Sequence, residues 1–118
     1  MAAPPTVSLA TQWINDGTAN AVVQAIRKET SARHALLLKH LSDWRVWSQP
    51  ECFHAWLNLP DTLSPNEAAS FWRSRGVAAV ASTAFATNTA PPRAVRLCLG
   101  GPGGLAQCEQ SLRVVADV

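Results

Sequence analysis

The chain lacks several features that would place a protein in a functional class directly. It has no tyrosine, and only 15% of its 118 residues are charged, for a net charge of +2. A net charge this small argues neither for nor against a nucleic-acid partner, although dedicated binders usually show a denser basic patch. No apolar run approaches the ~18 residues of a membrane span. With 47% hydrophobic residues, the chain is expected to form about one ordinary domain with a real core.

Cysteine is also scarce. The three cysteines are Cys52, Cys98 and Cys108, an odd number without paired spacing, so they predict no disulfide framework. The first residues, 1–6, have neither a basic segment nor an apolar segment of a secretory signal. Both observations lead us to expect a reducing, cytoplasmic location.

The N-terminal third predicts two helices. Apolar spacing favours a helix over Val7–Asp16, and Gly17 is expected to end it. Thr18 is the expected N-cap of a second helix over Ala19–Leu41, which contains no glycine or proline. Such a helix is ~35 Å long, more than a domain of this size needs. We therefore expect part of it to pack on something outside this chain.

The side chains of this long helix divide into two sets. An apolar stripe is formed by Val22, Val23, Ile26, Leu37, Leu38 and Leu41. A basic set is formed by Arg27, Lys28, Arg33 and Lys39. Glu29 interrupts the basic set, so we interpret it as a solvated face and not as a nucleic-acid contact.

Residues 49–118 predict an α+β unit. The expected strands are Cys52–Leu59, Val77–Ala81 and Ala94–Leu99, and the expected helices run from Ser64 to Gly76 and over Leu105–Val115. Ser64, Pro65 and Glu67 form a capping-box pattern, and the apolar side of that helix is Ala68, Ala69, Phe71 and Trp72. Residues 82–93 read as loop. The prediction is a small antiparallel or mixed sheet of about three strands, with helices on one face, preceded by the long helix. Residues 1–48 would hold the N-terminal helices and residues 49–118 the small domain.

One face of the predicted sheet has an unusual composition. Alternation along the strands places on it His54, Trp56, Asn58, Arg96 and Cys98. This set is too polar for a core and too aromatic for plain solvent. We interpret it as a surface that meets a partner, a ligand or another domain.

Three other site hypotheses are weaker. Cys52, His54 and Cys98 have zinc-ligand chemistry but no close ligand spacing, so no metal is expected. The turn at residues 100–104 lacks the Lys-Ser/Thr ending of a phosphate loop and reads as a strand-to-helix connection. Ser82 and Thr83 near His54 have no clearly placed carboxylate to complete a nucleophilic site.

An ordered set of motifs resembles the MocR-type regulators of the GntR superfamily. The motifs are residues 13–19 (WINDGTA), residues 53–60 (FHAWLNLP), residues 75–80 (RGVAAV) with Ala84-Phe85, and residues 94–100 (AVRLCLG). Such regulators join a winged-helix DNA-binding domain to a domain resembling fold-type I aminotransferases, which binds pyridoxal phosphate. Here the resemblance covers only the C-terminal end: the long interdomain helix and the small domain.

The resemblance implies pyridoxal phosphate in a parent protein and no cofactor in this fragment, since neither Lys28 nor Lys39 matches the cofactor lysine. The winged helix would lie upstream, so no direct nucleic-acid contact is implied. The implied partners are the large domain of the parent, or a second copy, and an amino-acid-like carboxylate. Arg96 matches the arginine that binds that carboxylate, whereas Ala81 and Ser82 stand where relatives often have Pro-Gly, which puts the active-site loop in question.

Two alternative identities follow from the same residues. Ordinary aminotransferases share this ending, so the chain could belong to a true aminotransferase. The tryptophan-rich sheet face also allows a stand-alone interaction module. Whether it belongs to a regulator or to a true aminotransferase, the chain alone is not expected to catalyse transamination.

Overall fold

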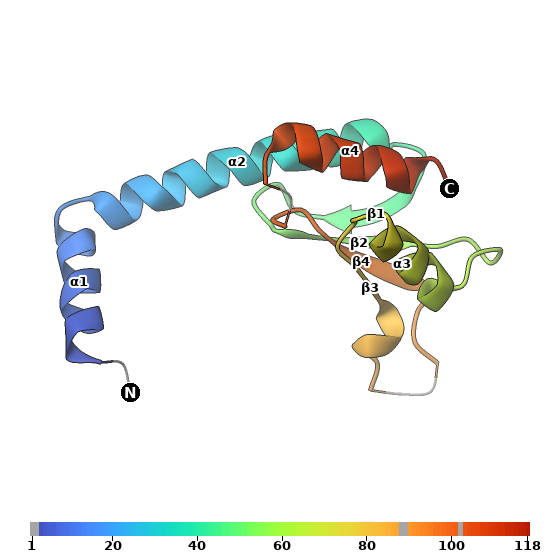
Figure 1. The fold of residues 1–118 in the computed structure, drawn as a ribbon, viewed down its shortest axis with the longest axis horizontal. Helices are drawn as coiled ribbons and strands as arrows, with labels where there is room; N and C mark the ends of the chain where they lie inside the picture. Colours follow the sequence, from blue (N-terminus) through green and yellow to red (C-terminus); the bar gives the residue numbers. More distant parts are fainter. Residues whose placement is uncertain (1–2, 88–89, 102) are drawn as a thin grey trace.

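The chain forms a helical arm joined to an α+β body (Figure 1). The computed structural model describes residues 3–87, 90–101 and 103–118. The arm comprises α1 (Pro4–Asn15) and the first part of α2 (Thr18–His40). The predicted loop at 82–93 and turn at 100–104 include residues 88–89 and 102, which lie outside the described residues.

The chain bends sharply between the two helices of the arm. Gly17 has a φ of 86°, a left-handed conformation that glycine adopts without steric cost. The expectation that Thr18 caps α2 is wrong. Gly17 occupies the cap position, and the Thr18 N–H donates to Asp16 Oδ1 at 2.9 Å, so it is the aspartate side chain that satisfies an N–H at the start of the helix.

The body contains one antiparallel sheet in the order β1-β2-β4-β3. Its strands are β1 (Arg45–Ser48), β2 (His54–Asn58), β3 (Ala79–Ala81) and β4 (Ala94–Cys98). The α+β class is confirmed, but the sheet has four strands where about three were predicted. The additional strand, β1, is a short edge strand beside β2. The division of the chain at residue 48 stays a prediction.

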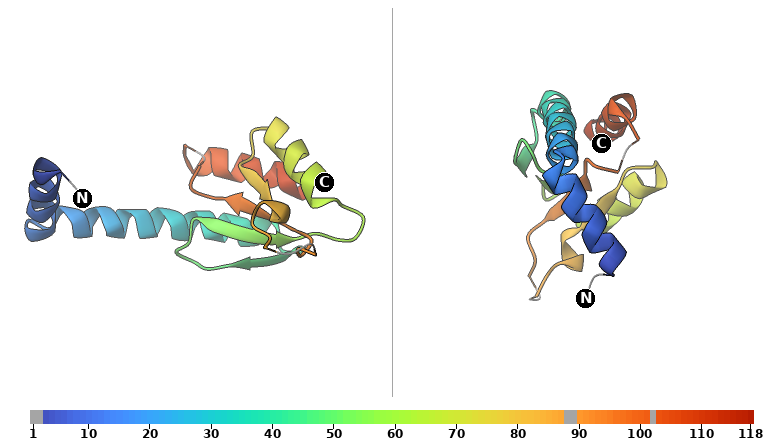
Figure 2. Two further views of the ribbon diagram at one scale, coloured as in Figure 1. Left: turned by 90° about the horizontal axis from the view of Figure 1, so that it is seen from below. Right: turned by 90° about the vertical axis from the view of Figure 1, so that its left-hand side faces the viewer.

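Three helices cover one face of this sheet (Figure 2). They are α3 (Pro65–Ser74), α4 (Leu105–Ala116) and the C-terminal half of α2. Their buried residues include Leu37 and Leu41 of α2, Ala69 and Trp72 of α3, and Cys108, Leu112 and Val115 of α4. These pack on the strand residues Ala55, Leu57, Ala79, Val95 and Leu97. The predicted one-sided arrangement is confirmed.

Helix α3 begins and ends largely as its sequence predicts. The Ser64 Oγ accepts a hydrogen bond from the Glu67 N–H at 3.5 Å, and Gly76 follows the helix with a φ of 84°. The expectation that Phe71 is buried is wrong. Phe71 is 43% exposed, and the Arg75 guanidinium lies 3.6 Å from its ring centroid. A cation over the ring covers it in place of the core.

The long helix differs most from its predicted division of faces. Leu37 and Leu41 are buried, but the other apolar residues expected in the stripe, Val22, Val23, Ile26 and Leu38, are exposed. Leu38 lies in the part of the helix that the body covers but is 55% exposed, whereas Val22, Val23 and Ile26 lie too far along the helix to reach the body. The body covers α2 only from Thr30 onward, so the N-terminal part of the stripe has no core to join.

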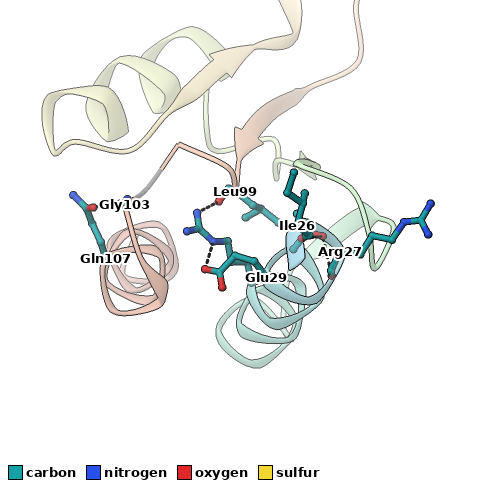
Figure 3. Close-up of polar contacts among 8 residues, drawn as sticks. Ile26, Arg27, Glu29, Leu99, Gly103 and Gln107 are labelled. Carbon is teal, nitrogen blue, oxygen red and sulfur yellow. Dashed lines mark hydrogen bonds and ion pairs between the residues drawn. The ribbon is translucent and has the colours of Figure 1, made fainter. Parts of the chain in front are cut away.

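Arg33 was expected on a solvated face, and this expectation is wrong. Its side chain is only 8% exposed, and its bonds include Nε to Glu29 Oε1 at 3.0 Å and Nη1 to the Leu99 carbonyl at 2.7 Å. Figure 3 shows Leu99 and Glu29 joined to the guanidinium by dashed lines. The arginine therefore ties α2 to the end of β4.

A second polar link joins α2 to α4. Glu109 Oε1 lies 3.2 Å from His40 Nε2, 3.8 Å from Lys39 Nζ and 2.9 Å from Arg113 Nη2. The contact with His40, helped by the neighbouring positive charges, lowers the pKa of the Glu109 carboxyl below its ordinary value.

Within the described ranges, no helix is both long enough and apolar enough to span a bilayer.

Candidate functional site

The sheet face opposite the helices carries the candidate site. Strand pairing places four side chains in one row across it: Trp47 of β1, Trp56 of β2, Arg96 of β4 and Val80 of β3. Directly paired residues point to the same face of a sheet. The predicted grouping of His54, Trp56, Asn58, Arg96 and Cys98 on this face is therefore confirmed by the strand register. We call this surface the open face.

Phe85 completes the row from outside the sheet. It follows η1 (Ser82–Ala84), and its ring centroid lies 6.4 Å from that of Trp56. The Arg96 guanidinium carbon lies 4.7 Å from the Phe85 centroid. The Phe85 N–H donates to the Ser82 carbonyl, and the buried Ser82 Oγ donates to the Pro92 carbonyl at 2.5 Å. These bonds hold the loop where Phe85 meets Arg96.

The Arg96 side chain is half-buried and has unused donor capacity. Its Nε is buried and has no hydrogen-bond partner among the described residues. The strand residues of the open face include no aspartate or glutamate, so the strands present no carboxylate to neutralise the guanidinium. A permanently charged, ring-backed guanidinium in this setting suits a carboxylate, which it can bind through two parallel hydrogen bonds.

The groups of the weaker hypotheses are arranged differently. His54 pairs directly with Cys98, and Cys52 precedes β2 in an exposed turn. In the part of the chain that the structure describes, no three histidine, cysteine or acidic side chains gather closely enough to hold a metal. The Thr83 hydroxyl donates to Asn66 Oδ1 at 2.8 Å, so its proton is engaged away from His54.

A hollow of the described surface lies at one end of β1 and β2, and Arg45 and Asn58 of the open face help to line it. It has a volume of about 630 Å³, opens to solvent, and is also lined by the segment before β1 and the turn after β2, including Trp44 and Asp61, and by the C-terminal Val118. Arg96 does not line it. Arg96 therefore lies on a part of the open face outside this hollow, where an enclosed site would require further walls.

The described residues do not fit pyridoxal phosphate by themselves. That cofactor needs a lysine amine within reach of its aldehyde. Lys28 is exposed on the arm, and Lys39 points to Glu109 on the helix side of the sheet. Neither reaches the open face. No chemistry of the cofactor can therefore be assigned to residues of this chain.

Comparison with known proteins identifies the fold. No protein-family model and no curated protein sequence matches the chain. A solved structure described as that of an archaeal alanine:glyoxylate aminotransferase matches with a TM-score of 0.64 over 76% of this chain, at 21% identity. The chain spans 22% of that protein's length. At this identity the likeness shows the fold alone: the chain is folded like one part of an aminotransferase.

The sequence analysis did not identify two residues of the open face. Trp47 lies in the unpredicted strand β1, and Phe85 lies in a segment read as loop. Trp47 could have been found, because Val46 and Ser48 flank it in an alternating pattern like that of a short strand. The stacking of Phe85 on Arg96 depends on the loop path after β3, for which the sequence holds no comparable signal.

Proposed function

We propose that this chain is the C-terminal small domain of a pyridoxal-phosphate-dependent, aminotransferase-like protein, in which Arg96 binds the carboxylate of an amino-acid substrate or effector. The observation that carries the proposal is the position of Arg96. It stands on the face that the helices leave uncovered, backed by Phe85, with its Nε unpartnered. The fold likeness supports the aminotransferase part of the proposal.

The surroundings of Arg96 strengthen carboxylate binding. Phe85 lies against the guanidinium, and Trp56 pairs with Arg96 across the sheet and contacts Phe85, so apolar rings stand beside the charge. Attraction between charges grows as the local dielectric constant falls. A charge-assisted hydrogen bond contributes ~1.5–3 kcal/mol, so one arginine can fix the orientation of a small acid.

Catalysis lies outside this chain in our proposal. The cofactor would be held by a large domain of the parent, and the small domain would supply Arg96 to the shared site. The MocR-like motifs favour a parent that is a transcriptional regulator, with an aminotransferase enzyme as the alternative. The gene sequence upstream of Met1 distinguishes them, because only the regulator encodes a winged helix before the large domain.

The test uses the full-length gene product and calorimetric titration with amino acids. Arg96→Gln should weaken binding ~10- to 100-fold while leaving pyridoxal phosphate bound, because the cofactor is anchored elsewhere. Arg45→Gln is the control, since Arg45 is an exposed arginine of the edge strand β1, two strands away from Arg96. Unchanged amino-acid affinity in Arg96→Gln would refute the assignment.

Stability of the short chain provides a check on the same residue. Arg96→Ala should lower the free energy of unfolding by less than ~1 kcal/mol, because the side chain leaves the core face and opens no internal cavity. Unfolding of this variant would mean that Arg96 is a structural residue.

A further inference from the structure

We infer that the acid bound at Arg96 carries an aromatic ring and a single carboxylate, as in a phenyl- or indolyl-substituted short acid. This inference rests on the proposed carboxylate role of Arg96 and extends it from the anchor group to the rest of the ligand. Three features of the open face carry it: the exposed rings beside Arg96, the absence of a second cation among them, and the spacing of the row.

The rings beside Arg96 are unusually accessible. Trp47 is 65% exposed and Phe85 is 45% exposed, although each has a neighbouring ring or charge that partly covers it. Trp56 connects them, since it pairs with Trp47 across the sheet and contacts Phe85. A ligand ring placed on this surface would gain offset or edge-to-face contacts with two or three aromatic partners.

The charge pattern disfavours a dicarboxylate. Within the row Trp47–Trp56–Arg96–Val80, Arg96 is the one ionisable side chain. Arg45 and His54, the other arginine and histidine on strands of this face, lie outside the row, because Arg45 pairs with Asn58 two strands from Arg96 and His54 pairs with Cys98. A second carboxylate would therefore lie over indole and phenyl rings. Ring faces are negative, and a desolvated charge without a partner is costly.

The spacing of the row suits a short linker between acid and ring. Adjacent strands lie ~4.8 Å apart, so Trp56 is one strand from Arg96 and Trp47 is two strands away, at ~10 Å. A carboxylate on the guanidinium with a phenyl group one or two bonds further on reaches Trp56 and Phe85. An indolyl group extends to Trp47. A ligand without a ring leaves this apolar surface in water.

The test titrates the 118-residue chain with four probes and follows the Arg Nε–H and Trp indole N–H signals by NMR. The probes are phenylacetate, acetate, succinate and benzyl alcohol. We expect phenylacetate to bind at least ~5-fold more tightly than acetate or succinate, the scale of one good ring contact. Benzyl alcohol, which has the ring without the charge, should bind more weakly than phenylacetate by a similar factor or more.

Matched variants separate the two parts of the inference. Arg96→Gln should abolish binding of all three acids. Phe85→Leu should remove the preference for phenylacetate over acetate. Trp47→Leu, a change two strands from Arg96, should leave acetate binding unchanged within ~2-fold. Phe71→Leu is the control, because Phe71 has an exposed fraction of 43%, similar to that of Phe85, but lies on α3. It should alter nothing.

The outcomes distinguish failure of the ring from failure of the anchor. Equal affinities for acetate and phenylacetate, or tighter binding of succinate, would overturn the inference and leave the carboxylate role of Arg96 intact. Binding of acids that survives Arg96→Gln would overturn the proposed role of Arg96 as well. No binding of any acid at tens of millimolar would overturn the inference that this face of the chain selects the ligand.

Discussion

Replacement of Arg33 by methionine tests whether the arginine that joins α2 to the end of β4 stabilises the fold. Methionine keeps an unbranched apolar stem and has a helix propensity similar to that of arginine, so the change mainly removes the guanidinium. The guanidinium donates to the Leu99 carbonyl at 2.7 Å, and Leu99 is only 3% exposed. Water cannot readily replace the lost donor at that carbonyl.

The expected loss is ~2–3 kcal/mol in the free energy of unfolding. Most of it is the charge-assisted bond to Leu99 and the cost of leaving a buried carbonyl unsatisfied. The ion pair with Glu29 adds little, because the Glu29 side chain is 46% exposed and can be solvated by water.

Arg27→Met is the matched control on the same helix. Arg27 lies 3.8 Å from Glu51, and both side chains are more than half exposed, so its loss should cost less than ~0.5 kcal/mol. Urea unfolding followed by tryptophan fluorescence measures both variants, since Trp72 is fully buried and contacts Trp44. The reasoning is refuted if the two variants differ by less than ~0.5 kcal/mol.

Three further predictions follow from other parts of the fold. Glu109→Gln should lower the free energy of unfolding at pH 7. The difference in that free energy between the variant and the unsubstituted chain should be smaller at pH 3, because a carboxyl with a lowered pKa stabilises the fold only while ionised. The chain should self-associate in analytical ultracentrifugation, and a strictly monomeric full chain would contradict this. Removal of residues 1–26 should abolish association and lower the free energy of unfolding by less than ~1 kcal/mol. Gel-filtered chain incubated with pyridoxal phosphate should show no absorbance near ~420 nm; a band that disappears in Lys39→Arg would contradict it.

Local sequence signals predicted most of the body. The glycines at 17 and 76 end their helices with positive φ, and alternation in β2 and β4 placed the right side chains on each face. These features depend on steric and periodic rules that act within a few residues. The same rules identified Arg96 as a residue that leaves the core.

Signals that depend on distant contacts were missed. Arg33 is buried only because the carbonyl of Leu99, 66 positions further along the chain, comes to lie beside α2. Strand β1 has four residues and half of them are exposed, so its pairing with β2 decides its conformation more than its own pattern does. Phe85 joins the site through a loop whose path is set by Ser82 and Pro92.

The arm carries an apolar surface that the body of this chain leaves uncovered. Among the described residues, every buried side chain lies at position 30 or later, so residues 3–28 add nothing to the core. Residues 4–26 contain a single charged side chain, Asp16, and expose seven large apolar side chains that are 42–70% accessible: Val7, Leu9, Trp13, Ile14, Val22, Val23 and Ile26.

An isolated helix as short as α1, which has 12 residues, is marginally stable in water, and most helices gain their stability from packing an apolar face. The body cannot supply that packing, because it meets α2 only beyond the arm. The open face likewise presents Trp47 and Phe85 without a cover. Two uncovered apolar surfaces on one small domain are more than a monomer ordinarily exposes. We propose that a large domain of a parent protein or a second copy of the chain covers them, and that the same contact encloses the site around Arg96.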